Sequence, residues 1–148
     1  MMVKKFSFIT IIISILIVLQ FDKVDAESMS TKDAKVYFIA PSDGQTVHNP
    51  VKIVFGISGM KIRPAGINEE HSGHHHLLID LPVLPNLNQP IPSDKQHMHF
   101  GKGQTETIIN LTEGEHTLQL LFADYIHIPH KPPLFSDKIK IIVKNHND

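Results

Sequence analysis

The sequence contains neither cysteine nor tryptophan. Without cysteine the chain forms no disulfide bond and offers no thiolate, which excludes thiol catalysis and sulfur-ligated zinc sites. Lysine and arginine number 14 against 15 acidic residues, for a net charge of −1 with the histidines neutral. The basic residues form no cluster, so the sequence lacks the positive surface typical of nucleic-acid-binding proteins.

Long hydrophobic runs are absent except near the N-terminus. An apolar run from Phe6 to Leu19 follows Lys4 and Lys5. It is shorter than the ~20 apolar residues that cross a bilayer. Together with the modest side chains of Val24 and Ala26, it predicts a secretory signal peptide over residues 1–26, cleaved after Ala26. The alternative is an uncleaved anchor, which would then be the only membrane contact. We expect the protein to be periplasmic or secreted.

The remaining sequence predicts one all-β domain over residues 35–144, with a flexible lead-in at 27–34 and a tail at 145–148. No window shows the sustained 3.6-residue apolar period of a helix. Strands are predicted at residues 36–39, 51–57, 74–81, 105–111, 116–123 and 136–143, and loops at 59–72, 82–92 and 124–133. The pattern favours an immunoglobulin-like antiparallel β-sandwich of about 6–8 strands with long Pro/His-rich loops.

Histidine is the abundant residue: the chain has 11. In a strand, residues i and i+2 face the same side about 7 Å apart, so a His-x-His pair can chelate one ion. Imidazole nitrogen suits copper and zinc. The predicted ligands come from two such pairs and one His-x-x-His pair: His74, His76, His97, His99, His127 and His130.

Two other histidines are predicted to be structural. His75 shares a strand face with Leu77, and His116 shares one with Leu118. Both histidines should therefore face the core and be hydrogen-bonded. The same alternation sends His74 and His76 to the opposite face or into a cleft.

Five segments of the sequence resemble the domain-of-unknown-function 4399 family: FIAPSDGQTV, GHHHLLID, HMHFGKGQTE, EGEHTLQLLFAD and HIPHKPP. The resemblance spans Lys35 to Val143. It implies a small exported β-sandwich domain with no assigned activity. Besides the histidines, it marks Asp80, Lys102 and Gln104 as motif residues, and these are candidate ligand contacts.

The sequence therefore predicts a cell-envelope domain that holds a copper or zinc ion without catalysing a reaction and without an organic cofactor. A second reading is a metal-free module that recognises a small anionic or sugar ligand or an envelope protein partner. A third is a metal-dependent enzyme, which needs three protein ligands and an open position. We disfavour the enzyme because no catalytic residue set is evident, and Asp80 and Glu106 are the only nearby carboxylates by strand alternation.

Overall fold

The computed structural model describes residues 27–145. The predicted signal peptide, residues 1–26, therefore lies outside the described residues. Between Glu27 and Asn145 the chain forms ten strands and no helix, so this part holds no helix long and apolar enough to cross a membrane. The prediction of an all-β domain is confirmed.

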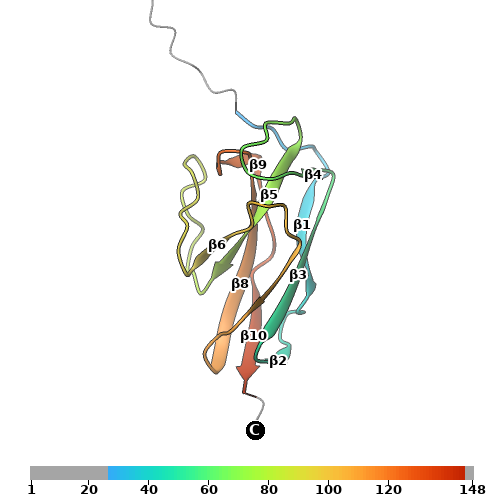
Figure 1. Ribbon diagram of the computed structural model, residues 1–148. Helices are drawn as coiled ribbons and strands as arrows, with labels where there is room; N and C mark the ends of the chain where they lie inside the picture. Colours follow the sequence, from blue (N-terminus) through green and yellow to red (C-terminus); the bar gives the residue numbers. More distant parts are fainter. Residues whose placement is uncertain (1–26, 146–148) are drawn as a thin grey trace, which may run out of the picture.

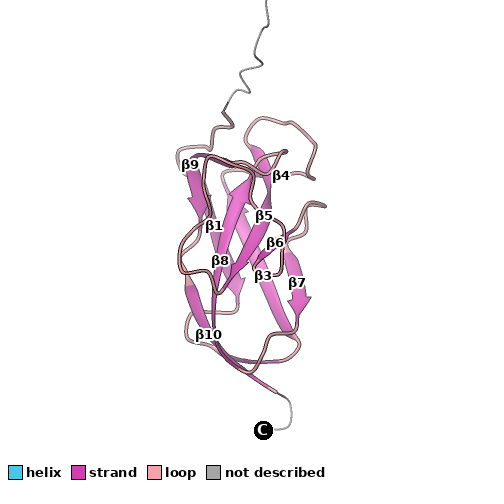
Figure 2. Ribbon diagram, turned by 90° about the vertical axis from the view of Figure 1, so that its left-hand side faces the viewer, coloured by secondary structure: helices cyan, strands magenta, loops and turns pink. Residues whose placement is uncertain are grey.

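The strands form two sheets that pack face to face as a sandwich (Figures 1 and 2). The smaller sheet has the order β1-β3-β7, from β1 (Lys35–Ala40), β3 (Val51–Ser58) and β7 (Glu106–Ile109). The larger has the order β2-β10-β8-β5-β4, with β6 also paired to β5 and β9 to β8. Its strands are β2 (Thr46–His48), β4 (Lys61–Ile62), β5 (Ser72–Ile79), β6 (His97–His99), β8 (Gly114–Ala123), β9 (Pro129–Phe135) and β10 (Ile139–Lys144).

The six strands predicted from the sequence overlap β1, β3, β5, β7, β8 and β10. The prediction missed the short strands β2, β4 and β6. It also placed a loop where β9 begins, because that segment holds three prolines, which cannot donate to a ladder. Proline is tolerated there, since β9 pairs with β8 alone. Two short pairs, β2–β10 and β4–β5, are parallel, so the larger sheet is mixed rather than purely antiparallel.

The main core lies between the sheets, where every second residue of β3, β5 and β8 points inward. On β5 these residues are His75, Leu77 and Ile79. The His75 ring centroid lies 4.9 Å from that of Phe55 and 5.0 Å from that of Phe122. His75 thus takes the core-facing position that the alternation predicts.

A second apolar layer covers the other face of β5 and β8. Leu78 and Leu121 pack there against Ile91, which belongs to the proline-rich segment between β5 and β6. This segment closes over the sheet, and every residue of β5 is buried as a result. His74 and His76 lie on the predicted face, but the face is covered: both side chains are 0% exposed.

The residues before β1 are tied to β9. Ser30 N donates to Lys131 O at 3.0 Å, and Lys131 N donates to Ser28 O at 2.9 Å. The Ser30 hydroxyl also donates to Pro132 O at 2.8 Å. The chain therefore enters the sandwich at the end where β4 and β9 lie, opposite the C-terminal end of β10 (Figure 1).

We predict that Phe55→Ala lowers the free energy of unfolding by about 3–5 kcal/mol, because it opens a cavity among packed aromatic rings. Phe55 is 1% exposed, whereas Ile39 on β1 is 60% exposed. Ile39→Ala is the matched control and should change stability by less than about 0.5 kcal/mol. Urea denaturation measures both; equal midpoints for the two variants would contradict this assignment of the core.

Candidate metal centre

Three histidines from separate parts of the chain converge on one point: His74, His99 and His127. Each offers one ring nitrogen, and these nitrogens all lie within 4.8 Å of one another. His99 Nε2 is 3.2 Å from His74 Nε2 and 3.1 Å from His127 Nε2. We call these residues the histidine triad.

The pairing of β5 with β6 determines the positions of two members of the triad, His74 and His99. In the register His76 stands opposite His99 and Leu78 opposite His97, so His99 ends β6 on the covered face of β5 that also carries His74. The His99 ring lies over Gly101. A Cβ atom at Gly101 would be 2.2 Å from His99 Cε1 and 2.4 Å from Nε2. Glycine at this position is what allows the His99 ring to reach the triad.

A tight loop between β8 and β9 carries the third member. Asp124 Oδ1 accepts hydrogen bonds from Ile126 N at 3.0 Å and Ile128 N at 2.9 Å. His127 O accepts from Ile91 N at 2.9 Å. These bonds hold His127 at a φ of 71°, a left-handed conformation uncommon for residues other than glycine. The Asp124 carboxylate thus shapes the turn that presents the His127 ring.

A fourth imidazole lies against the triad. The His76 ring centroid is 4.9 Å from that of His74, 5.2 Å from His99 and 5.9 Å from His127. Neither ring nitrogen of His76 has a hydrogen-bond partner among the described residues, and the same holds for His74 Nδ1. A buried polar atom without a partner costs about 1–3 kcal/mol, so several such atoms at one place call for an explanation.

Hydrogen bonding within the triad is geometrically insufficient. A ring nitrogen of imidazole has one in-plane position, taken either by a proton or by a lone pair. His99 Nε2 can therefore make one well-directed hydrogen bond, yet two nitrogens lie at hydrogen-bond distance from it. Two metal–nitrogen bonds of ~2.05 Å span such separations at an angle of about 100°. A single ion at this point would bond to the nitrogens that hydrogen bonding cannot satisfy together.

Burial favours the neutral form of two members of the triad, His74 and His99, and of the adjoining His76. Burial, followed by the neighbouring His99 and His127, lowers the pKa of His74 to about 3. Burial, with His74 and His99, lowers the pKa of His76 to about 2. Burial and His127 also lower the pKa of His99. Within residues 27–145 the triad includes no carboxylate. Neutral imidazole is the form that coordinates a metal ion.

Three predicted ligands lie outside the triad: His76, which adjoins it, and His97 and His130. His97 Nδ1 is 2.9 Å from Asp94 Oδ1, and the His97 side chain is 13% exposed. His130 is fully buried on β9 and stacked on Phe122, with ring centroids 5.7 Å apart. Its Nδ1 is 2.8 Å from Ser28 Oγ. The structure thus brings together one histidine from each predicted pair, with His76 beside them.

The two histidines predicted to be structural behave differently. His116 Nδ1 is 2.7 Å from Asp80 Oδ2, and its Nε2 is 2.8 Å from Thr112 O, so it is hydrogen-bonded as expected. Burial alone would lower the pKa of His116, but its bonds to Asp80 and Thr112 raise it. Burial lowers the pKa of His75, and a weaker interaction with the Gly56 backbone raises it. The rings of Phe55 and Phe122 pack against the His75 ring.

The remaining candidate contacts serve local structure. Asp80, at a φ of 53°, binds His116 with one oxygen and accepts from Thr117 N at 2.8 Å with the other. It lies six residues beyond His74 on an extended strand, a distance of about 20 Å. Gln104 Oε1 accepts from Lys102 N at 2.9 Å and closes the turn after β6. The side chains of Asp80, Lys102 and Gln104 are exposed.

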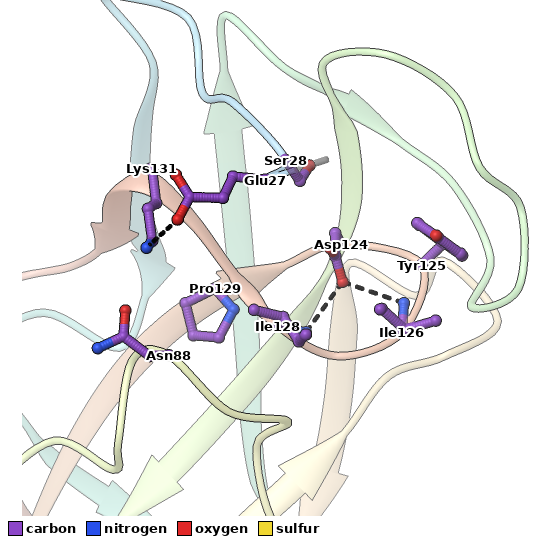
Figure 3. Close-up of a pocket in the computed structure, with 9 residues that line it drawn as sticks. All are labelled: Glu27, Ser28, Asn88, Asp124, Tyr125, Ile126, Ile128, Pro129 and Lys131. Atoms are coloured by element: carbon purple, nitrogen blue, oxygen red, sulfur yellow. Dashed lines mark hydrogen bonds and ion pairs between the residues drawn. The ribbon is translucent and has the colours of Figure 1, made fainter. Parts of the chain in front are cut away.

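A small pocket lies behind the loop that carries His127 (Figure 3). Its volume is about 140 Å³, and Asp124, Tyr125, Ile128 and Lys131 help to line it. The Asp124 carboxylate is turned to the backbone of the loop, and Lys131 is paired with Glu27. These polar groups are bonded to each other or to the backbone of the loop, and they brace the loop that carries His127.

The sequence assigned no role to two supporting residues, Asp124 and Gly101, although Gly101 belongs to the HMHFGKGQTE segment. Asp124 three positions before His127 fits the pattern of an aspartate that caps a tight turn. Gly101 lies two positions after the candidate ligand His99. A glycine at such a position allows a ring to approach the backbone closely. Both signals are present in the sequence, but they become specific only when the turn and the ring packing are known.

Comparison with known proteins yields one finding. A family model described as a domain of unknown function, number 4399, matches residues 53–144. This range contains every histidine of the triad together with His76, Gly101 and Asp124. No curated protein matches, and no solved structure matches.

We predict that the metal-free protein loses stability as the pH falls below about 6.5. Burial lowers the pKa values of His74, His75 and His76 to about 3, 4 and 2. Below pH 6.5 these rings take up protons in the unfolded chain but not in the folded one. Each ring then reduces the free energy of unfolding by up to about 1.4 kcal/mol per pH unit.

Differential scanning calorimetry in EDTA between pH 7.5 and 5.5 tests this. The unfolding temperature should fall steadily below pH 6.5, and His75→Leu should make that fall shallower. An unfolding temperature that is the same at pH 7.5 and 5.5 would show that these rings are not buried in neutral form.

Proposed function

Because the chain belongs to the domain-of-unknown-function 4399 family, which carries no assigned activity, we propose that it is a non-catalytic metal-binding domain whose histidine triad holds a copper or zinc ion. His74, His99 and His127 would each supply Nε2. The observation that carries the proposal is the crowding at His99 Nε2, which has two ring nitrogens at 3.1 and 3.2 Å. One in-plane position cannot satisfy both of them by hydrogen bonding.

The donor set supports copper or zinc over other ions. Calcium and magnesium take oxygen ligands, whereas imidazole nitrogen suits copper, zinc, nickel and iron. The triad also lacks a carboxylate that would serve as a general base next to a metal-bound water. Holding an ion, rather than using it in a hydrolytic reaction, is the role that this nitrogen-only group favours.

Isothermal titration calorimetry with Zn(II) and Cu(II) at pH 7.5 tests the proposal. We expect one ion per chain, and His99→Ala should weaken binding by about 100-fold or more, since even residues that merely orient ligands contribute 10- to 100-fold. The matched control is His97→Ala, on the same short strand, where the side chain is paired with Asp94. Its affinity should equal that of the unmodified protein. Absence of binding tighter than millimolar, or equal losses in both variants, would refute the triad as a metal site.

We also propose that the domain acts outside the cytoplasm. The apolar run at residues 6–19 with its basic start supports export, and an oxidising compartment is consistent with a chain that uses no cysteine. Mass spectrometry of the protein purified from the producing cells should find an N-terminus at Glu27. Recovery of the chain with residues 1–26 attached would favour the anchor instead.

A further inference from the structure

We propose that the ion bound by the triad is an exchangeable cargo, passed on by direct ligand exchange on the His99 side, and not a structural ion. This inference rests on the proposed function. Beyond the proposed function, it specifies the role of the ion and the route by which the ion leaves.

The first argument is that each ligand is held in place by the protein alone. His74 lies in the middle of the larger sheet, where β5 pairs with β8 on one side and with β6 on the other. After His99 the chain is fixed by Phe100 N, which donates to His75 O at 3.1 Å. The Asp124 turn fixes His127. A structural metal ion joins elements that would otherwise separate, and here the elements are joined without one.

The second argument is that the ligand nitrogens are already close. Two of the three pairs are separated by 3.1 and 3.2 Å. Two metal–nitrogen bonds of about 2.05 Å from one ion require separations of this size. Binding then needs little rearrangement, and release leaves the fold unchanged. Such preorganisation is the property that a protein needs if it gains and loses an ion repeatedly.

The third argument is that the site is open on one side. His74 and His76 are fully buried and form its floor. His127 is half-buried and His99 is exposed. A competing ligand from solvent or from a partner protein therefore meets His99 first. Gly101, which adjoins the His99 ring, carries no side chain that could cover it.

His76, which lies in the buried floor of the site, provides a substitute ligand during exchange. Neither nitrogen of His76 has a hydrogen-bond partner among the described residues, so turning that ring toward the ion breaks no hydrogen bond. The His76 ring centroid lies 4.9 Å from that of His74 and 5.2 Å from that of His99. When an incoming ligand displaces His99, the ion keeps His74 and His127 and gains His76. The step exchanges one neutral nitrogen donor for another, so no proton or electron is transferred.

The experiment follows zinc transfer from the loaded exported protein to the dye 4-(2-pyridylazo)resorcinol by stopped-flow absorbance at pH 7.5. We expect the transfer rate to rise with dye concentration, because the dye enters the open side and forms a ternary complex before the ion leaves. The metal-free protein should retain the far-ultraviolet circular dichroism of the loaded protein and unfold cooperatively.

Gly101→Ala provides a variant that keeps all four imidazoles. The added Cβ would collide with the His99 ring, which lies on the exposed side of the site, and would displace it from the other two ligands. Transfer should become about 10-fold faster, an effect typical of a residue that orients a ligand. His97→Ala should transfer zinc at the unmodified rate.

Three results would overturn the proposal. One is a transfer rate that does not depend on dye concentration, since the ion would then leave before the dye arrives. Another is loss of the β-sheet signal when the metal is removed, which would make the ion structural. The third is an unchanged rate in Gly101→Ala. In all three cases zinc still binds in the calorimetric titration, so the proposed function stands; failure to take up zinc at all would refute both.

Discussion

The structure depends on the burial of one strand on both of its faces. β5 carries three consecutive histidines, and the alternation of a strand sends the middle ring into the core between the sheets and the outer two to the opposite side. On an ordinary sandwich strand that opposite side would face water. Here the proline-rich segment between β5 and β6 covers it, and Leu78, Leu121 and Ile91 make it a second apolar layer.

This double burial determines the chemistry of the rings. A charged imidazole is costly in an apolar environment, so the pKa values of His74, His75 and His76 fall well below the ordinary value and the rings stay neutral. Neutral rings keep a lone pair available. The same burial leaves several ring nitrogens without hydrogen-bond partners in the described part of the chain. The His75 ring packs against Phe55 and Phe122, whereas around His74 the unpaired nitrogens face other imidazoles.

The triad is buried on one side, at His74, and exposed on the other, at His99. Strand pairing fixes His74 and His99, and a single carboxylate, that of Asp124, organises the turn beneath His127. Metal sites that stabilise folds are usually enclosed by four ligands, whereas an accessible position is typical of sites that react or exchange. In the proposed site His99 is exposed and the triad includes no carboxylate, which supports exchange over hydrolysis. Preorganised ligands and one exposed ring are the features on which ion exchange relies.

The sequence alone determined the all-β class, six of the ten described strands and the faces of β5, because hydrophobic alternation is a local property that the residue order contains directly. It also singled out the segments that hold histidines. Tertiary structure decided which of them meet. His97 and His99 are equivalent in a His-x-His pattern, but the β5–β6 register places His99 beside His76 and leaves His97 with Asp94. His127 and His130 are separated in the same way, since the Asp124 turn presents one ring and β9 buries the other against Phe122. Register, loop closure and burial on a strand's second face are long-range properties, and no local pattern in the chain contains them.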